Sequence, residues 1–199
     1  MKNYKVCTRC VMDTSDSKIT FNNDGVCDHC LTFDKDILPS WNFGTGREEE
    51  LARIVKKIKT SSKDKDFDCI LGMSGGIDSS YLLYLVTKEL NLRPLVFHVD
   101  AGWNSQIAVN NIEKLVDGLG LDLYTEVIDW EEMKDLQRSF FKAGVIDIEM
   151  LTDQANFGTM YNLTKKYKIK TIFSGTNFST EHGGSKNWVW RKFDVMHIK

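Results

Sequence analysis

A polar stretch, LGMSGGIDSS at 71–80, places the glycine pair Gly75-Gly76 and three serines directly behind an apolar run. If the chain turns from a strand into a helix at Ser74, Gly75 and Gly76, successive backbone N–H groups point outward at the positive end of the helix dipole, which favours an anion. The glycines leave room for phosphate oxygens, and the hydroxyls of Ser74 and Ser79 add donors. The stretch therefore predicts a phosphate-binding loop, although it has neither a Walker A lysine nor the G-x-G-x-x-G of a dinucleotide-binding turn.

Asp78 is the unusual member of this loop. A carboxylate in the first helical turn suits the helix dipole, yet it repels a phosphate. Its presence is explained if Mg2+ lies between the two, because this ion characteristically bridges carboxylate and phosphate oxygens. The alternative is an ordinary acidic residue at the start of a helix. We take Asp78 as a candidate magnesium ligand and, with Ser74, as a candidate catalytic residue.

Four cysteines near the N-terminus form the pattern C-x2-C-x16-C-x2-C, made by Cys7, Cys10, Cys27 and Cys30. Each C-x2-C turn presents two thiolates to one ion, and two turns complete the tetrahedron of a closed zinc site. Buried or redox-active thiols are the alternative, and His29 is an alternative ligand. If all four cysteines bind, zinc has no open coordination position and its role is structural.

The elements that position these residues follow from the alternation of apolar and helical patterns after Phe67. Short apolar segments predict strands at 67–73, 94–100, 122–128 and 170–175. Helical patterns separate them at 78–90, at 105–118 and between 130 and 167. This alternation predicts an α/β fold with a doubly wound parallel sheet, in which ligands bind beyond the carboxyl ends of the strands.

The sequence before this sheet divides into two parts. We expect a zinc ribbon at 1–38, then a linker and an amphipathic helix at 39–66, and the α/β domain at 67–199. The stretch DKDILPSWNFGTG (34–46) is typical of a linker, because it contains one proline and two glycines. From position 47, an apolar face predicts the helix, with the residues Leu51, Ile54, Val55 and Ile58.

Composition narrows the classes of function. In 199 residues, 42% are hydrophobic, which is enough for one sizeable core. Twenty-six basic and 28 acidic residues give a net charge of -2, so nucleic acid is an unfavoured partner. The sequence has no signal-peptide h-region and no run of about 18 apolar residues, so we expect a cytoplasmic protein with no membrane partner. There, its cysteines are expected to be thiols or metal ligands.

The loop sequence S-G-G-I-D-S (74–79), after a buried strand, resembles the pyrophosphate loop, or PP-loop, of the N-type ATP pyrophosphatases. These enzymes cleave ATP to AMP and pyrophosphate. The resemblance implies a fold of the adenine nucleotide alpha hydrolase kind, with ATP and Mg2+ at the loop. It places the phosphates of ATP on Ser74, Gly75, Gly76, Asp78 and Ser79.

Two later stretches are similar to segments that lie near ATP in such proteins. FHVDAG (97–102) ends the second predicted strand, and SGTNFSTE (174–181) follows the last one. The resemblance implies a nucleoside side made by His98, Val99 and Asp100, and a far rim made by Gly175, Thr176 and Asn177. Glu181 is then a candidate second magnesium ligand.

The combination of CTRCVMDTSD, GMSGGIDSSYLLYL and HVDAGWNS resembles the N-acetyl sugar amidotransferases of O-antigen (lipopolysaccharide) and flagellin glycan biosynthesis, along essentially the whole chain. That resemblance implies an enzyme that converts the acetamido group of a nucleotide-linked sugar into an acetamidino group, using ammonia. The chain has no glutaminase signature, since Cys69 lies within the first predicted strand and is expected in the core. Ammonia would therefore come from a separate glutaminase assembly.

Two other functions stay open. Some sulfur-inserting relatives that thiolate tRNA combine a zinc ribbon with the same loop, but this chain has no cysteine after Cys69, and its lysine-rich stretches at 56–65 and 165–170 are typical of solvated surfaces. A catalytically incomplete nucleotide-binding fragment is the second alternative, because members of the amidotransferase family usually continue well beyond position 199.

The last part of the sequence, TEHGGSKNWVWRKFDVMHIK (180–199), has two interpretations. Its aromatic and basic side chains could stack on a base or sugar and hold phosphates, or the alternating pattern could be a half-buried strand. The residues concerned are Trp188, Trp190, Arg191 and Lys192. His182 is the histidine best placed for mutation, although no general base is assigned. The remaining tryptophans are expected in the core.

Overall fold

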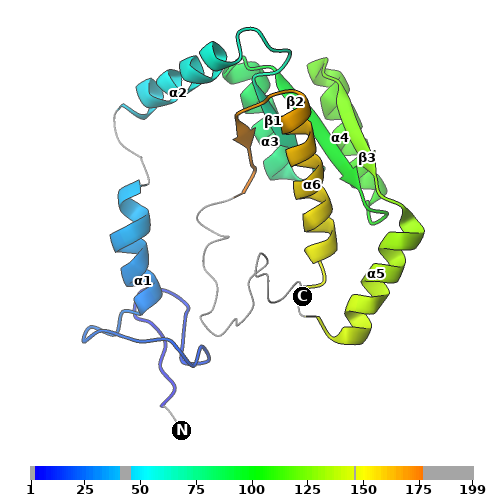
Figure 1. Cartoon of the computed structure of the whole chain (residues 1–199). Coiled ribbons are helices and arrows are strands. Elements are labelled where there is room, and N and C mark those ends of the chain that lie inside the picture. Colours follow the sequence, from blue (N-terminus) through cyan, green and yellow to red (C-terminus); the bar gives the residue numbers. More distant parts are fainter. Residues whose placement is uncertain (1–2, 41–45, 146, 177–199) are drawn as a thin grey trace. The chain divides into compact units, whose positions relative to one another are not determined.

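The computed structural model describes residues 3–40, 46–145 and 147–176 (Figure 1). This part of the chain forms two compact units, one before Glu49 and one from Glu49 to Thr176, and each is described by itself. In chain order the elements are α1 (Asp28–Thr32), the π-type turn η1 (Phe33–Ile37), the 3-10 turn η2 (Leu38–Ser40), α2 (Arg47–Ser61), β1 (Cys69–Gly72), α3 (Ile77–Tyr84), the π-type turn η3 (Leu85–Glu89), β2 (Pro94–Asp100), α4 (Gln106–Leu119), β3 (Leu123–Val127), α5 (Trp130–Ala143), α6 (Met150–Lys166) and β4 (Ile172–Phe173).

The N-terminal unit is built from short turns and one helical segment. Isolated antiparallel bridges join Val6 to Asp13 and Phe21 to Cys27. Its small core contains the buried residues Cys7, Ile19 and Cys27. The helical segment that starts with α1 continues through η1 and η2 to position 40, so the prediction of a linker from position 34 is wrong for residues 34–40. The two glycines that indicated a linker, Gly44 and Gly46, follow this helical segment in the sequence. Pro39 is tolerated because it lies in the final short turn, η2.

The second unit contains a four-stranded parallel sheet with the order β3-β2-β1-β4. In its register, Ile70 lies opposite Leu95 on one side and opposite Ile172 on the other. The four predicted strands are all present, and β2 has the bounds expected from its apolar run. The prediction of an α/β fold with a parallel sheet is therefore confirmed.

Helices cover both faces of the sheet. One core cluster joins Leu71 of β1 and Val96 of β2 to Leu83 of α3 and Ile112 of α4. A second cluster joins the alternate strand positions to α6, through Ile70, Leu95, Phe97, Val99 and Leu163. Because successive side chains of a strand point to opposite faces, the two clusters lie on opposite sides of the sheet, as Figure 1 shows with α6 in front and α3 and α4 behind. The sheet is doubly wound.

The strand order reverses next to β1. The chain moves from β1 to β2 and β3 on one side, and then returns to place β4 on the other side. In open α/β sheets, ligands bind outside the carboxyl ends of the strands at such a switch point. The loop that follows β1 lies there.

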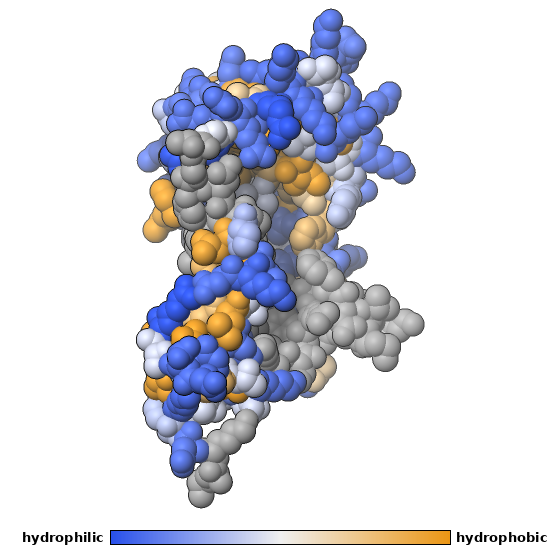
Figure 2. Space-filling model, turned by 90° about the vertical axis from the view of Figure 1, so that its left-hand side faces the viewer, coloured by the Kyte–Doolittle hydropathy of each residue, from blue (hydrophilic) through white to orange (hydrophobic). Residues whose placement is uncertain are grey.

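Helix α2 has the predicted start, but only part of its apolar face is buried. Ile58 is buried and Val55 packs against the first core cluster, whereas Leu51 and Ile54 are 45% and 46% exposed. The lysines of α2 are exposed, and Figure 2 shows mainly hydrophilic surface at the end of the molecule that carries this helix. This surface is the solvated face expected for the lysine-rich stretch. Among the described residues, no helix is both long enough and apolar enough to cross a membrane.

A buried charged group joins the start of β1 to the start of β2. Asp68 accepts hydrogen bonds from the backbone N–H of Arg93 at 2.8 Å and from its Nη2 at 2.9 Å, and a further one from the hydroxyl of Ser62. Burial raises the pKa of the Asp68 carboxyl, but the hydrogen bonds from Arg93 and Ser62 outweigh burial and bring the pKa below its ordinary value. The ionised form of Asp68 therefore stabilises the fold.

We predict that Asp68→Asn lowers the free energy of unfolding by about 2–3 kcal/mol near neutral pH, because Arg93 and Ser62 lose their charged partner. The folded pKa lies below the unfolded one, so the contribution of Asp68 is present above about pH 4 and disappears as the pH falls through the folded pKa. Urea unfolding at several pH values measures both effects. The exposed Asp64→Asn is the matched control, and an equal loss in that variant would contradict the assignment.

Candidate functional site

The loop between β1 and α3 is held by its own hydroxyl groups. The Oγ atoms of Ser74 and Ser79 lie 3.1 Å apart, and the N–H of Gly76 donates to Ser74 Oγ at 3.3 Å. Ser79 Oγ donates to the carbonyl of Gly76 at 3.2 Å. Two of the predicted loop hydroxyls thus shape the loop, in addition to any contact that they make with a ligand.

Gly75 lies directly against helix α4. Its φ is +76°, and a Cβ at this position would lie 2.5 Å from the carbonyl oxygen of Ala108. On the same side, Asn111 Nδ2 donates to the carbonyl of Gly75 at 3.2 Å. Only glycine fits both the left-handed backbone and this close approach. The conformation of the loop therefore depends on α4, which sequence reasoning did not connect with it.

The N-terminus of α3 is available to an anion. Gly76 is the N-cap with an extended backbone, and within the described residues no side chain caps the helix. The N–H groups of the first turn carry the positive end of the helix dipole, and helices commonly satisfy them with a bound anion. Asp78 lies in this turn and is exposed, so its carboxylate can reach a cation that accompanies the anion.

His98 links the loop to the end of β2. Its Nδ1 lies 2.7 Å from the carbonyl oxygen of Met73, and Asn104 Nδ2 lies 3.0 Å from its Nε2. Because a carbonyl only accepts, Nδ1 carries the proton, and in the neutral ring Nε2 accepts from Asn104. The buried imidazole therefore fixes the residue before Ser74. Sequence reasoning assigned His98 to the nucleoside side but missed Asn104, although this amide lies in the quoted stretch HVDAGWNS.

A cavity of about 390 Å³ lies at the carboxyl ends of β1, β2 and β4. Its size is within the range of small-molecule sites. The predicted residues Ser74, His98, Val99 and Gly175 line it, together with residues of α6 that the sequence did not single out. Gly75 and Gly76 line a neighbouring hollow of about 440 Å³ beside α4.

The other predicted positions are distributed around this cavity or lie outside the described residues. Asp100 accepts from the N–H of Gly102 at 2.9 Å, which closes the turn after β2. A Cβ on Gly175 would lie 3.2 Å from the backbone nitrogen of Ser79, so the segment after β4 lies next to the start of α3. Thr176 is exposed. Seven candidates lie outside the described residues: Asn177, Glu181, His182, Trp188, Trp190, Arg191 and Lys192.

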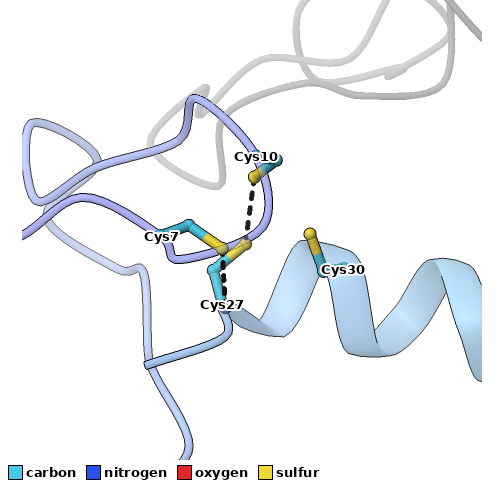
Figure 3. A group of neighbouring side chains, drawn as sticks. All are labelled: Cys7, Cys10, Cys27 and Cys30. Carbon is cyan, nitrogen blue, oxygen red and sulfur yellow. Dashed lines mark hydrogen bonds between the residues drawn. The ribbon is translucent and has the colours of Figure 1, made fainter. Parts of the chain in front are cut away.

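The four N-terminal cysteines converge on one point (Figure 3). Their Sγ atoms all lie within 4.8 Å of one another. A tetrahedral zinc site with Zn–S bonds of about 2.3 Å places its sulfurs about 3.8 Å apart, so a small closure of the group accommodates the ion. The backbone N–H groups of Arg9 and Cys27 donate to Cys7 Sγ at 3.4 and 3.2 Å, as suits a thiolate. The residues present fit structural zinc.

The shifted pKa values of three of these cysteines also suit a metal site. Burial raises the pKa of the Cys7 thiol, but backbone hydrogen bonds from Arg9, Cys27 and Cys10 outweigh burial and lower that pKa to about 6. Burial raises the pKa of Cys27 and of Cys30, and neighbouring thiols add to both increases. The lowered pKa of Cys7 favours its thiolate, and a bound cation would favour deprotonation of Cys27 and Cys30.

Neither His29 nor the fifth cysteine, Cys69, belongs to the group of four sulfurs. His29 Nε2 lies 3.3 Å from Asp16 Oδ2, and His29 is not a member of the sulfur group. The geometry therefore favours four cysteines over a site with His29. Cys69 is fully buried in β1, as expected for a core residue, and burial raises its pKa to about 12.

The comparisons with known proteins agree with this geometry. Residues 68–197, more than half of the chain, match the model of the phosphoadenosine phosphosulfate reductase domain family. Over 108 residues the chain is 31% identical to the glutamine-hydrolyzing GMP synthase of Streptomyces avermitilis, and the match covers 54% of this chain and 19% of that protein. The chain thus spans about a fifth of the length of this curated relative.

Two solved structures are similar to part of this chain. The glutamine-dependent NAD+ synthetase from Acinetobacter baumannii, in complex with adenosine diphosphate, has a TM-score of 0.50 at 20% identity, over 63% of this chain and 24% of that one. The NH3-dependent NAD synthetase from Campylobacter jejuni has a TM-score of 0.47 at 14% identity, over 65% of this chain and 56% of that one. The first of these likenesses shows the fold.

We predict that the purified chain contains about one zinc ion, and that Cys27→Ser loses it and lowers the unfolding temperature of the N-terminal unit, because three thiolates do not close the tetrahedron. Elemental analysis by mass spectrometry measures the metal. Cys69→Ala is the control for cysteine loss as such and is expected to retain zinc. Equal zinc content in Cys27→Ser and the unmodified chain would contradict the assignment.

We further predict that Gly75→Ala lowers the free energy of unfolding by about 1–3 kcal/mol, because alanine is strained at positive φ and its methyl group meets the Ala108 backbone. Gly118→Ala is the matched control, since it lies in α4 with no atom within 4 Å of the added methyl group. That control is expected to raise stability by up to about 1 kcal/mol. Denaturant unfolding measures the free energy of unfolding of both variants. An equal change in Gly75→Ala and Gly118→Ala would refute the packing argument.

Proposed function

The chain belongs to the phosphoadenosine phosphosulfate reductase domain family, and with it to the PP-loop ATP pyrophosphatase superfamily, and on this basis we propose that it is an ATP-dependent amidotransferase. Its acceptor is the acetamido group of a nucleotide-linked N-acetyl amino sugar, and its products are the acetamidino sugar, AMP and pyrophosphate. The observation that carries this proposal is the loop at the switch point. There, an uncapped helix N-terminus, a left-handed glycine and two hydroxyls offer a combination that suits a polyphosphate.

The chemistry explains why an amide needs ATP. The acetamido oxygen attacks the α-phosphorus of ATP, a P–O bond forms, and the bond to pyrophosphate breaks. Ammonia then adds to the activated carbon, AMP leaves with the former amide oxygen, and the loss of a proton gives the amidine. The protein contributes position and charge stabilisation: loop N–H groups hold the phosphates in line, and no side chain needs to form a covalent bond.

Two metals accompany this proposal. Asp78 would hold Mg2+ against the phosphates, with Glu181 as a second ligand, and the ion supplies neutralisation of the phosphate charge. Zinc on the four cysteines would stabilise the N-terminal unit without taking part in the reaction, because four thiolates leave no open position.

The use of ammonia rests on two supports. The first is the resemblance of the N-terminal cysteine pattern and loop to N-acetyl sugar amidotransferases. The second is the identity shared with a glutamine-hydrolyzing GMP synthase. Cys69 is fully buried, so it cannot serve as a glutaminase nucleophile, and a separate glutaminase assembly is proposed as the source of ammonia.

The same cysteine inventory argues against sulfur chemistry. Thiolation of tRNA, or reduction of a sulfonucleotide by a protein thiol, needs a reactive sulfur near the nucleotide. All five cysteines are described, four of them in the N-terminal cluster and the fifth buried in β1. Cys69, which belongs to the same unit as the cavity of about 390 Å³, does not line that cavity. This distribution favours ammonia as the nucleophile.

We predict that Mg-ATP with ammonium releases AMP and pyrophosphate when a UDP-linked N-acetyl amino sugar is added, and that Asp78→Asn reduces this release by about 100-fold or more. The exposed Glu89→Gln, near the other end of the same helical segment, is the control and should keep full activity. A coupled pyrophosphate assay and mass spectrometry of the sugar measure the two products.

Assays with unmodified tRNA in place of the sugar distinguish tRNA thiolation from the proposed amidotransferase function. Release of pyrophosphate that depends on tRNA and not on the sugar would refute the proposed acceptor. ATP binding without turnover on either acceptor would favour the catalytically incomplete nucleotide-binding module instead.

A further inference from the structure

A second cavity, of about 420 Å³, adjoins the cavity at the loop. The two cavities share Thr152, which lies in the first turn of α6. The Nδ2 of Asn156, which also lines the loop cavity, donates to the carbonyl of Thr152 at 3.0 Å. A molecule in the second cavity therefore lies next to whatever occupies the first one, with Thr152 between them.

The walls of this second cavity are held in place without a ligand. The ring of Trp103 contacts Trp130 edge to face, with centroids 5.2 Å apart and an interplanar angle of 77°. The turn before it is fixed by Gly102, at φ +82°, where a Cβ would lie 2.3 Å from the Trp130 ring. On the other wall, the buried Gln137 donates from Nε2 to the carbonyl of Ile148 at 2.9 Å. The cavity is preformed, as small-molecule sites usually are.

The lining combines exposed aromatic rings with carboxylates. Trp103 and Phe141 are 59% and 58% exposed, which is far more than the core role that the sequence suggested for the tryptophans. Glu149 and Asp153 lie beside them on the same cavity, and Thr152 adds a hydroxyl. The site thus offers a flat apolar surface and several hydrogen-bond acceptors, and none of the described residues that line it is cationic.

This combination fits a sugar ring. The C–H face of a pyranose is apolar and covers an aromatic ring, whereas its hydroxyls donate to carboxylates. A polyanion is disfavoured, because two carboxylates repel phosphate groups. These carboxylates therefore disfavour the diphosphate of a nucleotide sugar, and likewise an RNA backbone, as occupants of this cavity.

We propose that this cavity binds the amino-sugar ring of the acceptor, with Trp103 under the apolar face of the ring and Glu149 and Asp153 accepting from its hydroxyls. The acetamido group then extends past Thr152 toward ATP in the loop cavity. This assignment rests on the proposed function for the identity of the acceptor. Beyond that function, the assignment specifies the cavity that recognises the acceptor, and it specifies the apolar face and the hydroxyls of the sugar ring as the recognised features.

The direct test is sugar binding without turnover. Saturation-transfer NMR on the whole chain, with UDP-linked N-acetylglucosamine and N-acetylgalactosamine and with their methyl glycosides as probes, reports contact with the ring protons. We expect Trp103→Ala to weaken binding of these probes by about tenfold or more and Glu149→Gln by about three- to tenfold, as for central anchor residues of a site. Tyr161→Ala and Glu131→Gln are the matched controls, because both residues are exposed and line neither cavity.

Binding of Mg-ATP to each variant shows that the fold and the loop are intact, and we expect it to change by less than about twofold. Unchanged sugar binding in both Trp103→Ala and Glu149→Gln, or no binding of any probe to the unmodified chain, overturns the assignment.

The turnover assay keeps this outcome separate from the fate of the proposed function. If sugar-dependent pyrophosphate release persists with an unchanged KM for the sugar in Trp103→Ala, the cavity assignment fails while the amidotransferase proposal stands. If no sugar supports release but the probes still bind in a manner that depends on Trp103, the amidotransferase proposal fails and the cavity remains a sugar site.

Discussion

The close approach of Gly75 to helix α4 is the constraint on which the candidate site depends. The glycine places its carbonyl on Asn111 and its bare Cα against the Ala108 backbone, so the loop takes its shape from a helix that follows a different strand. From this point the chain enters α3 through the extended Gly76, and the first-turn N–H groups face outward. His98 adds a second fixed point, because its ring holds the carbonyl of Met73 immediately before the loop. Together, these contacts hold the backbone at the start of the loop from two sides.

Much of this architecture is encoded locally and was predictable. The buried strands are short apolar runs flanked by polar or turn residues, and β2 was located to the residue because Pro94 opens it and Asp100 ends it. The position of the loop after β1 and the cysteine group were also predicted from spacing, since each depends on residues close together in the sequence. Their three-dimensional convergence adds distances, such as 4.8 Å or less between the sulfurs, that spacing alone cannot supply.

Other features depend on contacts between distant segments, and the sequence did not reveal them. The packing of α4 on Gly75 and the amide of Asn104 on His98 join residues that only the folded sheet brings together. The sequence of α2 is amphipathic along the whole helix, yet only the second half of the helix contacts the core. An amphipathic pattern indicates which face of a helix can be buried, but it does not indicate how much of that face is buried. Trp103 and Trp130 were expected in the core, whereas each is more than a third exposed, and Trp103 lines a cavity.

The pairing of β4 with β1 has a consequence for the order in which the molecule assembles. Roughly a hundred residues separate Ile172 from its partner Ile70, while β1, β2 and β3 are neighbours both in sequence and in the sheet. On a ribosome, the loop can form as soon as α4 emerges, but its opposite wall at Gly175 must wait until β4 has been synthesised. Closing such a long loop is entropically costly, so this wall is expected to join last. A nascent chain therefore carries the candidate site with one wall missing, and the site becomes complete only in the final stage of folding.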